Sequence, residues 1–211
     1  MLQFHFIRHA QSEGNVRPEL VGGQSTHYPL TALGEAQARL VAARYAKEGL
    51  AENYKVFSST ALRARQTAAV FCAEFGIESE LVLEPALLEL SQGDWTGLVR
   101  ADVYTPLALQ QIKADAWHFS APNGESQADV GRRFYLWLRA QIGIFGDKEM
   151  IFYVFTHGVA IKSVLCELFG FDASHTYKIN IENTSITRVD YTPSTCFSLH
   201  KVNDYAHLGS K

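Results

Sequence analysis

The chain has 211 residues, of which 47% are hydrophobic and 19% are charged, and its formal net charge is -3. This length suits one fold with a full hydrophobic core, so we expect residues 1–211 to form a single domain. A slightly negative chain has no overall field that would attract nucleic acid or an anionic membrane, so we expect neither as a partner. Any anion that the protein binds must be held by a local group of donors.

The three cysteines, Cys72, Cys166 and Cys196, are widely spaced along the chain. An odd number without a zinc-type pair argues against a disulfide framework and a structural zinc site. We interpret all three as small buried hydrophobic residues in a reducing compartment. The first residues do not form a signal peptide, and no apolar run reaches the length of a membrane span, so we expect a cytoplasmic location.

Strands and helices alternate along the first part of the chain. Residues 3–8 are apolar and β-prone, whereas the glycines and prolines of 9–30 predict a long loop. Thr31 and Gly49 are suitable caps for a helix over 32–48, in which we expect Leu33, Leu40, Val41 and Tyr45 near one face. The next predicted elements are a strand at 55–58, a helix at 60–76 and a strand at 81–83.

The second part of the chain continues the alternation after an irregular segment, 85–124, which includes a predicted helix near 101–114. The continuous apolar run at 150–156 is typical of a central parallel strand. Helices are predicted over 125–141 and from 158 to about 168, followed by two or three β segments between 177 and 201. This order predicts an α/β fold, a three-layer α/β/α sandwich with a mostly parallel central sheet.

Polar residues follow three of the predicted strands, at residues 8–9, 58–59 and 156–158. In open α/β sheets, ligands bind beyond the carboxyl ends of the strands. If these strands are neighbours, Arg8, His9, Arg63 and His157 converge, and helices that begin after 59 and 157 point their positive ends at the same place. Guanidinium and imidazole groups in this arrangement are suited to a compact, multiply charged anion such as phosphate.

Motifs in a fixed order extend this pattern over nearly the whole chain. They are RHAQSEGN at 8–15, SSTALRARQTA at 58–68, LELSQGDWTG at 88–97, PNGES at 122–126, THG at 156–158 and NTSIT at 183–187. Together they resemble the histidine phosphatase superfamily, also called the phosphoglycerate-mutase-like proteins. The resemblance implies the fold predicted above, and it implies that neither a metal nor another cofactor is needed.

The resemblance also implies roles for individual residues. His9 would be the nucleophile and would be transiently phosphorylated, and Glu89 would donate a proton to the leaving oxygen. The phosphoryl oxygens would be held by Arg8, Arg63 and His157 with help from Asn15, and by Ser12 and the Gly158 backbone as minor contacts. Glu13 and Asp94 remain alternatives for the acid.

The chemistry of these residue types agrees with the implied roles. An imidazole attacks only when its reacting nitrogen is unprotonated, and a backbone carbonyl that accepts the proton of the other nitrogen would fix that tautomer. Because charge on a transferring phosphoryl group lies on its equatorial oxygens, two arginines and a cationic His157 would supply what a metal supplies elsewhere. A carboxylate that gives and later takes a proton contributes roughly 10²–10⁴ in rate.

The first motif departs from the family pattern at two positions. Ala10 and Gln11 follow the nucleophile, where the family usually has Gly and often Glu. Alanine is harmful only where the backbone needs a positive φ, and loss of a carboxylate should not weaken phosphate binding. We expect activity to be retained, with the effect on specificity left open.

These observations favour the phosphatase branch, a metal-independent phosphomonoesterase acting on a small phosphorylated metabolite through phosphohistidine. Alternatives are a phosphoglycerate mutase, a non-catalytic phosphate-binding module and a metal-dependent hydrolase. A mutase needs extra cations, yet the stretch after Glu89, residues 90–95, reads Leu-Ser-Gln-Gly-Asp-Trp where mutases carry Arg and Tyr, and 114–123 has no arginine. Aromatic candidates for the pocket wall are Trp95, Tyr104, Trp117 and Phe119. The oligomeric state stays open, with a homodimer as one option.

Overall fold

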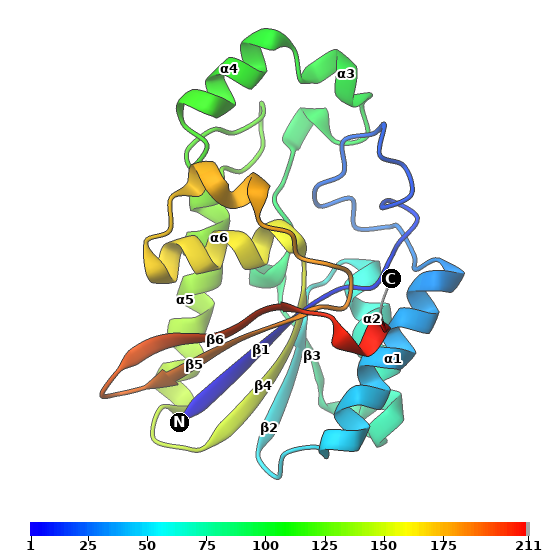
Figure 1. Ribbon diagram of the computed structural model, residues 1–211, viewed down its shortest axis with the longest axis vertical. Helices are drawn as coiled ribbons and strands as arrows, with labels where there is room; N and C mark the ends of the chain where they lie inside the picture. Colours follow the sequence, from blue (N-terminus) through cyan, green and yellow to red (C-terminus); the bar gives the residue numbers. More distant parts are fainter. Residues whose placement is uncertain (210–211) are drawn as a thin grey trace.

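A six-stranded sheet forms the centre of the computed structural model, which describes residues 1–209 (Figure 1). The strand order is β3-β2-β4-β1-β5-β6. The strands are β1 Leu2–Arg8, β2 Tyr54–Ser58, β3 Leu81–Leu83, β4 Met150–Thr156, β5 Ile186–Thr192 and β6 Cys196–Asp204. The first four pair in parallel, and β5 and β6 join them antiparallel, so the predicted mostly parallel sheet is confirmed.

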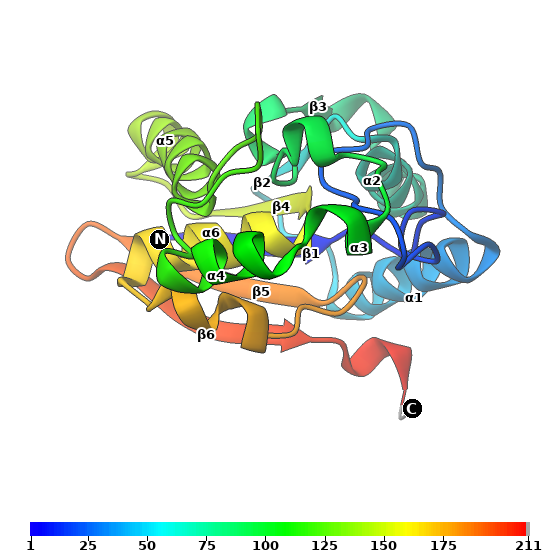
Figure 2. The ribbon, with the colours of Figure 1, turned by 90° about the horizontal axis from the view of Figure 1, so that it is seen from above.

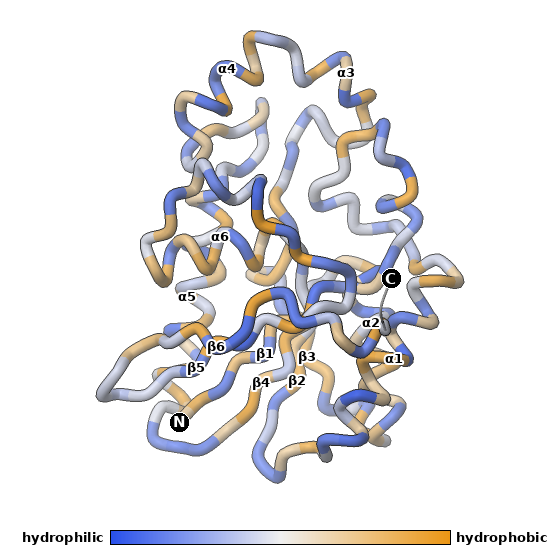
Figure 3. Tube along the Cα trace, in the orientation of Figure 1, coloured by the Kyte–Doolittle hydropathy of each residue, from blue (hydrophilic) through white to orange (hydrophobic). Residues whose placement is uncertain are grey.

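Helices cover both faces of this sheet, as the predicted three-layer fold requires. The helices are α1 Ala32–Glu48, α2 Leu62–Phe75, α3 Arg100–Val103, α4 Pro106–Ala114, α5 Gln127–Phe145 and α6 Gly158–Phe169. Phe152 and Val154 of β4 pack in one core with residues of α5 and α6, whereas Tyr153 and Phe155 pack in the other with α1 and α2. Because successive strand residues point to opposite faces, a strand covered on both sides is apolar throughout, which explains the hydrophobic run along β4 (Figure 3).

Most helix ends follow from single residues. The Thr31 hydroxyl accepts the Gly34 N–H at 3.0 Å, and Gly49, with φ of 83°, ends α1 at the predicted position. Ser126 and Asp129 form a reciprocal capping box at the start of α5. That helix continues to Phe145, about one turn beyond the predicted end.

Several expectations need correction. The single helix expected near 101–114 is two helices, because Thr105 accepts the Ala108 N–H and Pro106 starts a new first turn. Leu33 and Leu40 are exposed, since α1 turns its smaller residues and Tyr45 toward the core. Cys196 is exposed in the β5–β6 hairpin, unlike the buried Cys72 and Cys166. In the predicted β tail, strand structure begins only at Ile186.

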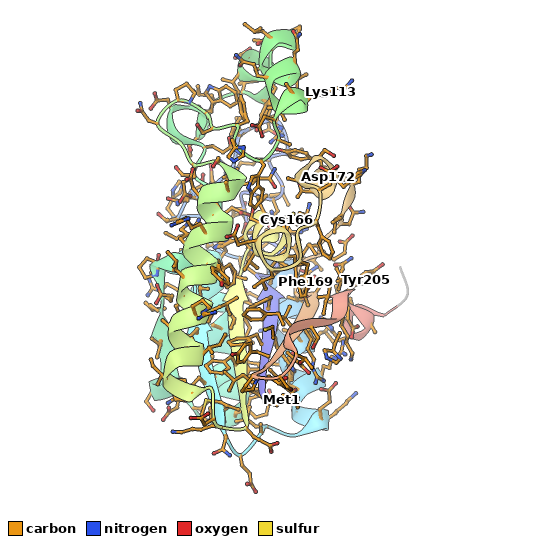
Figure 4. All side chains as sticks on the ribbon, turned by 90° about the vertical axis from the view of Figure 1, so that its left-hand side faces the viewer. Met1, Lys113, Cys166, Phe169, Asp172 and Tyr205 are labelled. Carbon is orange, nitrogen blue, oxygen red and sulfur yellow. The ribbon has the colours of Figure 1, made fainter. Side chains whose placement is uncertain are left out.

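Helices α3 and α4 stand beyond the carboxyl ends of the parallel strands (Figures 1 and 2). Met1 lies at one end of the molecule and Lys113 of α4 at the other, with the sheet between them (Figure 4). Within residues 1–209, no helix is both long and apolar enough to cross a bilayer. The fold therefore places a helical cap opposite the strand ends that carry the candidate site.

Candidate active site

The strand ends meet as the sequence predicts. Arg8 pairs with Thr156 across β1 and β4, and the backbone N–H of His9 donates to the Thr156 carbonyl at 2.9 Å. The ring centres of His9 and His157 are 5.1 Å apart, and Arg63 Nε lies 3.1 Å from His9 Nε2. Side chains from three separate stretches of sequence thus share one buried site, because β2, β4 and β1 are neighbours in the sheet.

Two hydrogen bonds determine the protonation of His9. Its Nδ1 lies 2.7 Å from the Ala10 carbonyl oxygen, which can only accept, so Nδ1 carries the proton. Its Nε2 accepts from Arg63 Nε, which can only donate, so Nε2 holds the lone pair. Burial, reinforced by Arg63 and Arg8, lowers the pKa of His9 well below its usual value. His9 is therefore a neutral imidazole whose unprotonated nitrogen faces a guanidinium.

The two arginines are held by backbone carbonyls. Arg63 donates from its terminal nitrogens to the carbonyls of Gly23, Gln24 and Ser25 at 2.8–3.2 Å. Arg8 Nη1 donates to the Ile181 carbonyl, and its Nε is buried without a hydrogen-bond partner among the described residues. Burial lowers the pKa of both groups, and Glu89 opposes this effect. Fixed positive charge is thus concentrated beside His9.

His157 is completely buried, and its Nε2 lies 2.8 Å from the Ser59 hydroxyl. Burial, reinforced by Arg63, lowers the pKa of His157 well below its usual value. Desolvation and the nearby guanidiniums act together here and favour a neutral ring. The cationic His157 expected beside a phosphoryl group stays a prediction. An anion beside the ring would favour its protonated form.

Glu89 joins this group from the segment after η2, a 3-10 turn at Pro85–Leu87. Its Oε1 accepts the N–H groups of Leu90 and Ala160 at 2.9 and 3.1 Å, and its Oε2 accepts that of Val159 at 3.1 Å. The carboxylate therefore sits at the positive N-terminal end of α6, where backbone N–H groups lack partners within the helix. This end of α6 begins one residue after His157.

The three residues predicted to bind substrate, Asn15, Ser12 and Gly158, lie in different surroundings. Asn15 is exposed, and its Oδ1 accepts from the backbone N–H and hydroxyl of Ser12 at 3.0 and 3.1 Å. Ser12 is buried and orients the Asn15 amide. Gly158 lies against Arg8, whose Nε would be 3.5 Å from an added Cβ.

A cavity of about 760 Å³ adjoins this buried group. Its wall includes Glu89, Asn15 and Gly23, whose carbonyl binds Arg63. The remaining wall has an apolar side and two arginines and consists of Gly14, Arg17, Pro18, Leu20, Gly22, Leu90, Gln92, Arg100, Ala101, Tyr104, Leu109, Ile112, Val159 and Tyr177. The cap helices α3 and α4 supply several of these residues, so the cap forms one wall of the cavity.

Of the four aromatic candidates, only Tyr104 lines this cavity. Trp95 packs behind it, with ring centres 5.3 Å apart, and Phe119 contacts Trp95 in turn. Trp117 packs near Gly131 of α5 instead.

The rival acids, Glu13 and Asp94, do not line the cavity. Asp94 is exposed and accepts from Asn123 at 2.9 Å.

Two arginines of the cavity wall, Arg17 and Arg100, are not among the site residues predicted from the sequence. Arg17 lies over the Tyr28 ring at 5.6 Å and Arg100 over the Tyr104 ring at 4.7 Å. They meet because Leu20 and Val99 form an isolated antiparallel bridge between two distant loops. The one feature of the sequence that could have indicated a site role for Arg17 is its position two residues after Asn15.

Ala10 and Gln11 fit the site without strain. Ala10 is buried, and it is not among the residues with positive φ, so this position does not require glycine. Gln11 accepts from Thr31 through both its backbone and side-chain oxygens and supports the start of α1 rather than the anion site.

Together, the α/β/α fold and a histidine between arginines at the strand ends agree with the phosphoglycerate-mutase-like class of proteins. Residues 4–205 match the model of the histidine phosphatase superfamily (branch 1). The chain belongs to this superfamily, which is one of enzymes.

Individual relatives differ in the activity that their names give. The chain is 31% identical to a probable phosphoglycerate mutase, GpmB, from Serratia proteamaculans, over 99% of this chain and 95% of the relative. A phosphoserine phosphatase mutant from Entamoeba histolytica has a TM-score of 0.81 at 21% identity, covering 99% of this chain and 100% of that one. A mycobacterial glucosyl-3-phosphoglycerate phosphatase has a TM-score of 0.78 at 24% identity, covering 96% and 98%. These two structures establish the fold.

Proposed function

We propose that this protein is a metal-independent phosphomonoesterase that transfers the phosphoryl group of a small metabolite to Nε2 of His9 and then to water. The observation that carries the proposal is the tautomer of His9, whose lone pair is on Nε2 beside Arg63. The bond from phosphorus to the ester oxygen breaks as the bond to Nε2 forms. The departing oxygen takes a proton from Glu89, which lines the cavity.

The second half of the reaction reverses these roles. Water attacks phosphorus, Glu89 takes its proton, and the electron pair of the phosphorus–nitrogen bond returns to Nε2. Arg8 and Arg63 neutralise the charge on the transferring group, and the charge that builds up favours the protonated form of His157. The buried N–H of Arg8 Nε, which has no partner among the described residues, supports this assignment, since buried N–H groups usually find an acceptor.

Trapping the phosphoenzyme tests the proposal. Wild-type protein, His9→Ala and a control, His118→Ala, are incubated with a ³²P-labelled phosphomonoester and quenched in base, where phosphohistidine survives. His118 is an exposed histidine of the cap. We expect label in the wild type and the control and none in His9→Ala, with hydrolysis unchanged by a chelator. Absence of label and of hydrolysis in the wild type would favour a phosphate-binding module, and loss of activity in chelator would favour a metal-dependent hydrolase.

The cavity wall supports a substrate whose alcohol part is largely apolar and bears a second anionic group. Leu90, Leu109 and Ile112 form apolar surface, whereas Arg17 and Arg100 have no ion pair within residues 1–209. Arginines of this kind are suited to a carboxylate or a second phosphate. The free thiols of the cysteines support a reducing compartment, and we propose a cytoplasmic location.

A phosphoglycerate mutase is the second candidate. The two wall arginines and the names of the curated relatives favour it. Against it, the stretch after Glu89, where mutases carry Arg and Tyr, contributes Leu90 and Gln92 to the cavity wall. Incubation with 3-phosphoglycerate, followed by ³¹P NMR, separates the two activities. A phosphatase releases inorganic phosphate, and a mutase produces the 2-phosphate isomer.

A further inference from the structure

Arg133 of α5 holds the main chain around Glu89. Its Nη1 donates to the Ala86 carbonyl at 2.7 Å, and its Nη2 donates to the carbonyl of Glu89 itself at 3.0 Å. Thr156, at the end of β4, donates its hydroxyl to the Leu87 carbonyl at 2.7 Å. Carbonyl groups on both sides of the turn that presents Glu89 are thus fixed by side chains of other elements.

Glu125 completes a two-pronged ion pair with Arg133. Its Oε1 accepts from Arg133 Nε at 2.9 Å and its Oε2 from Nη2 at 3.1 Å, a geometry that fixes both planar groups. The Arg133 side chain is only 21% exposed and the Glu125 side chain only 25%. The same Oε2 accepts the backbone N–H of Ser91 at 3.0 Å, so the pair binds the chain before and after Glu89.

The network continues to the nucleophile. Gln24 donates its side-chain amide to Glu125 Oε2 at 3.3 Å, and its carbonyl accepts from Arg63 Nη1 at 3.2 Å. Arg63 in turn donates to His9 Nε2. One continuous set of hydrogen bonds therefore links the backbone of Glu89 to the reacting nitrogen of His9.

This linkage bears on the rate because proton transfer needs a donor within hydrogen-bond distance of the leaving oxygen. The Glu89 carboxylate is fixed by the N-terminus of α6, and its main chain is fixed by Arg133 and Glu125. A displacement of about 1 Å in a group that must act on the substrate can cost about 10²-fold in rate.

We infer that Glu125 and Arg133 are positioning residues that keep the Glu89 carboxylate in register with His9. Neither lines the cavity, so they act through Glu89 and Gln24 rather than on the substrate. The inference rests on the proposed function, in which Glu89 is the proton donor.

The test uses two substrates that differ in their need for a proton. The leaving group of 4-nitrophenyl phosphate departs as a stable phenolate, whereas that of glycerol 2-phosphate is an alkoxide that must be protonated. The variants are Arg133→Lys, Glu125→Gln and a control, Arg132→Lys, at the exposed neighbouring position. The readout is kcat/KM, which reports the steps up to phosphorylation of His9, together with thermal unfolding of each variant.

We expect Arg133→Lys and Glu125→Gln to lower kcat/KM for glycerol 2-phosphate at least about tenfold more than for 4-nitrophenyl phosphate, because a displaced Glu89 loses part of its general acid catalysis. In a Glu89→Gln background, the same changes should alter this ratio no further, because coupled residues are not additive. Arg132→Lys should leave both substrates unaffected.

Equal losses on both substrates, or a failure of both variants to fold, would show a merely structural role and overturn the inference. If Glu89→Gln alone left the ratio unchanged in an active enzyme, the proposed acid role would fail instead, and the two failures are thereby distinguished.

Discussion

The Thr67 hydroxyl of α2 links the backbone at Ala10, next to the proposed nucleophile His9, to the backbone of Arg63. Removing this hydroxyl should lower both stability and activity. The hydroxyl donates to the Arg63 carbonyl at 2.7 Å and accepts the Ala10 N–H at 3.0 Å, in fully buried surroundings. Thr67→Val keeps the shape and leaves that N–H buried without its partner, which costs about 1–3 kcal/mol. Because the Ala10 carbonyl fixes the tautomer of His9, we also expect a lower kcat.

Urea unfolding, followed by circular dichroism, measures the change in the free energy of unfolding. The dependence of the free energy of unfolding on urea concentration should be unchanged, so the whole effect appears as a lower urea concentration at the midpoint of unfolding. A control, Thr96→Val, alters an exposed threonine and should change stability by less than about 0.5 kcal/mol. If Thr67→Val were as stable as the control, the Ala10 N–H would have another partner and the reasoning would be refuted.

Three further predictions concern individual groups. Burial above all lowers the pKa of His5 to about 4 from 6.5, so the unfolded chain binds the proton first as pH falls and stability is lost between these values. His5→Gln can still bond to the Tyr45 hydroxyl but cannot take up this proton. Between pH 7.5 and pH 5, its free energy of unfolding in urea should therefore fall by about 1–2 kcal/mol less than that of the wild type. An equal fall in both proteins would contradict this. Ser59→Ala removes the partner of His157 Nε2 and should raise the inhibition constant of phosphate by up to about tenfold, whereas an unchanged constant would show that the bond does not orient His157 for the anion. Arg100→Ala should lower kcat/KM about tenfold for esters that carry a carboxylate and leave neutral esters unaffected, and equal losses would argue against a second anion subsite.

Local signals explain why much of the fold could be predicted. Thr31, Gly49, Gly76 and Gly170 mark helix ends by their own geometry, and the apolar run of β4 reflects burial on both faces. The convergence of Arg8, His9, Arg63 and His157 followed from one rule, that parallel strands present their carboxyl ends at one edge. The break before Pro106 was also visible locally, as a threonine cap followed by proline at the first helical position.

The remaining features depend on contacts between distant segments. In the sequence, Arg133 cannot be distinguished from a solvent-exposed arginine of an amphipathic helix. Only in the folded chain does it reach the Ala86 and Glu89 carbonyls. Arg17 and Arg100 meet at the cavity because two loops pair at Leu20 and Val99. Complete burial beside two guanidiniums lowers the pKa of His157, an effect that the residue types alone do not reveal.

The nitrogen that carries the phosphoryl group tests the central claim most directly. ³¹P NMR of the trapped phosphoenzyme, with mass spectrometry of its peptides, distinguishes the two ring positions of phosphohistidine. Because Nδ1 of His9 donates to the Ala10 carbonyl, we predict phosphorylation of His9 at Nε2. Phosphate on Nδ1, or on any residue other than His9, would contradict the account.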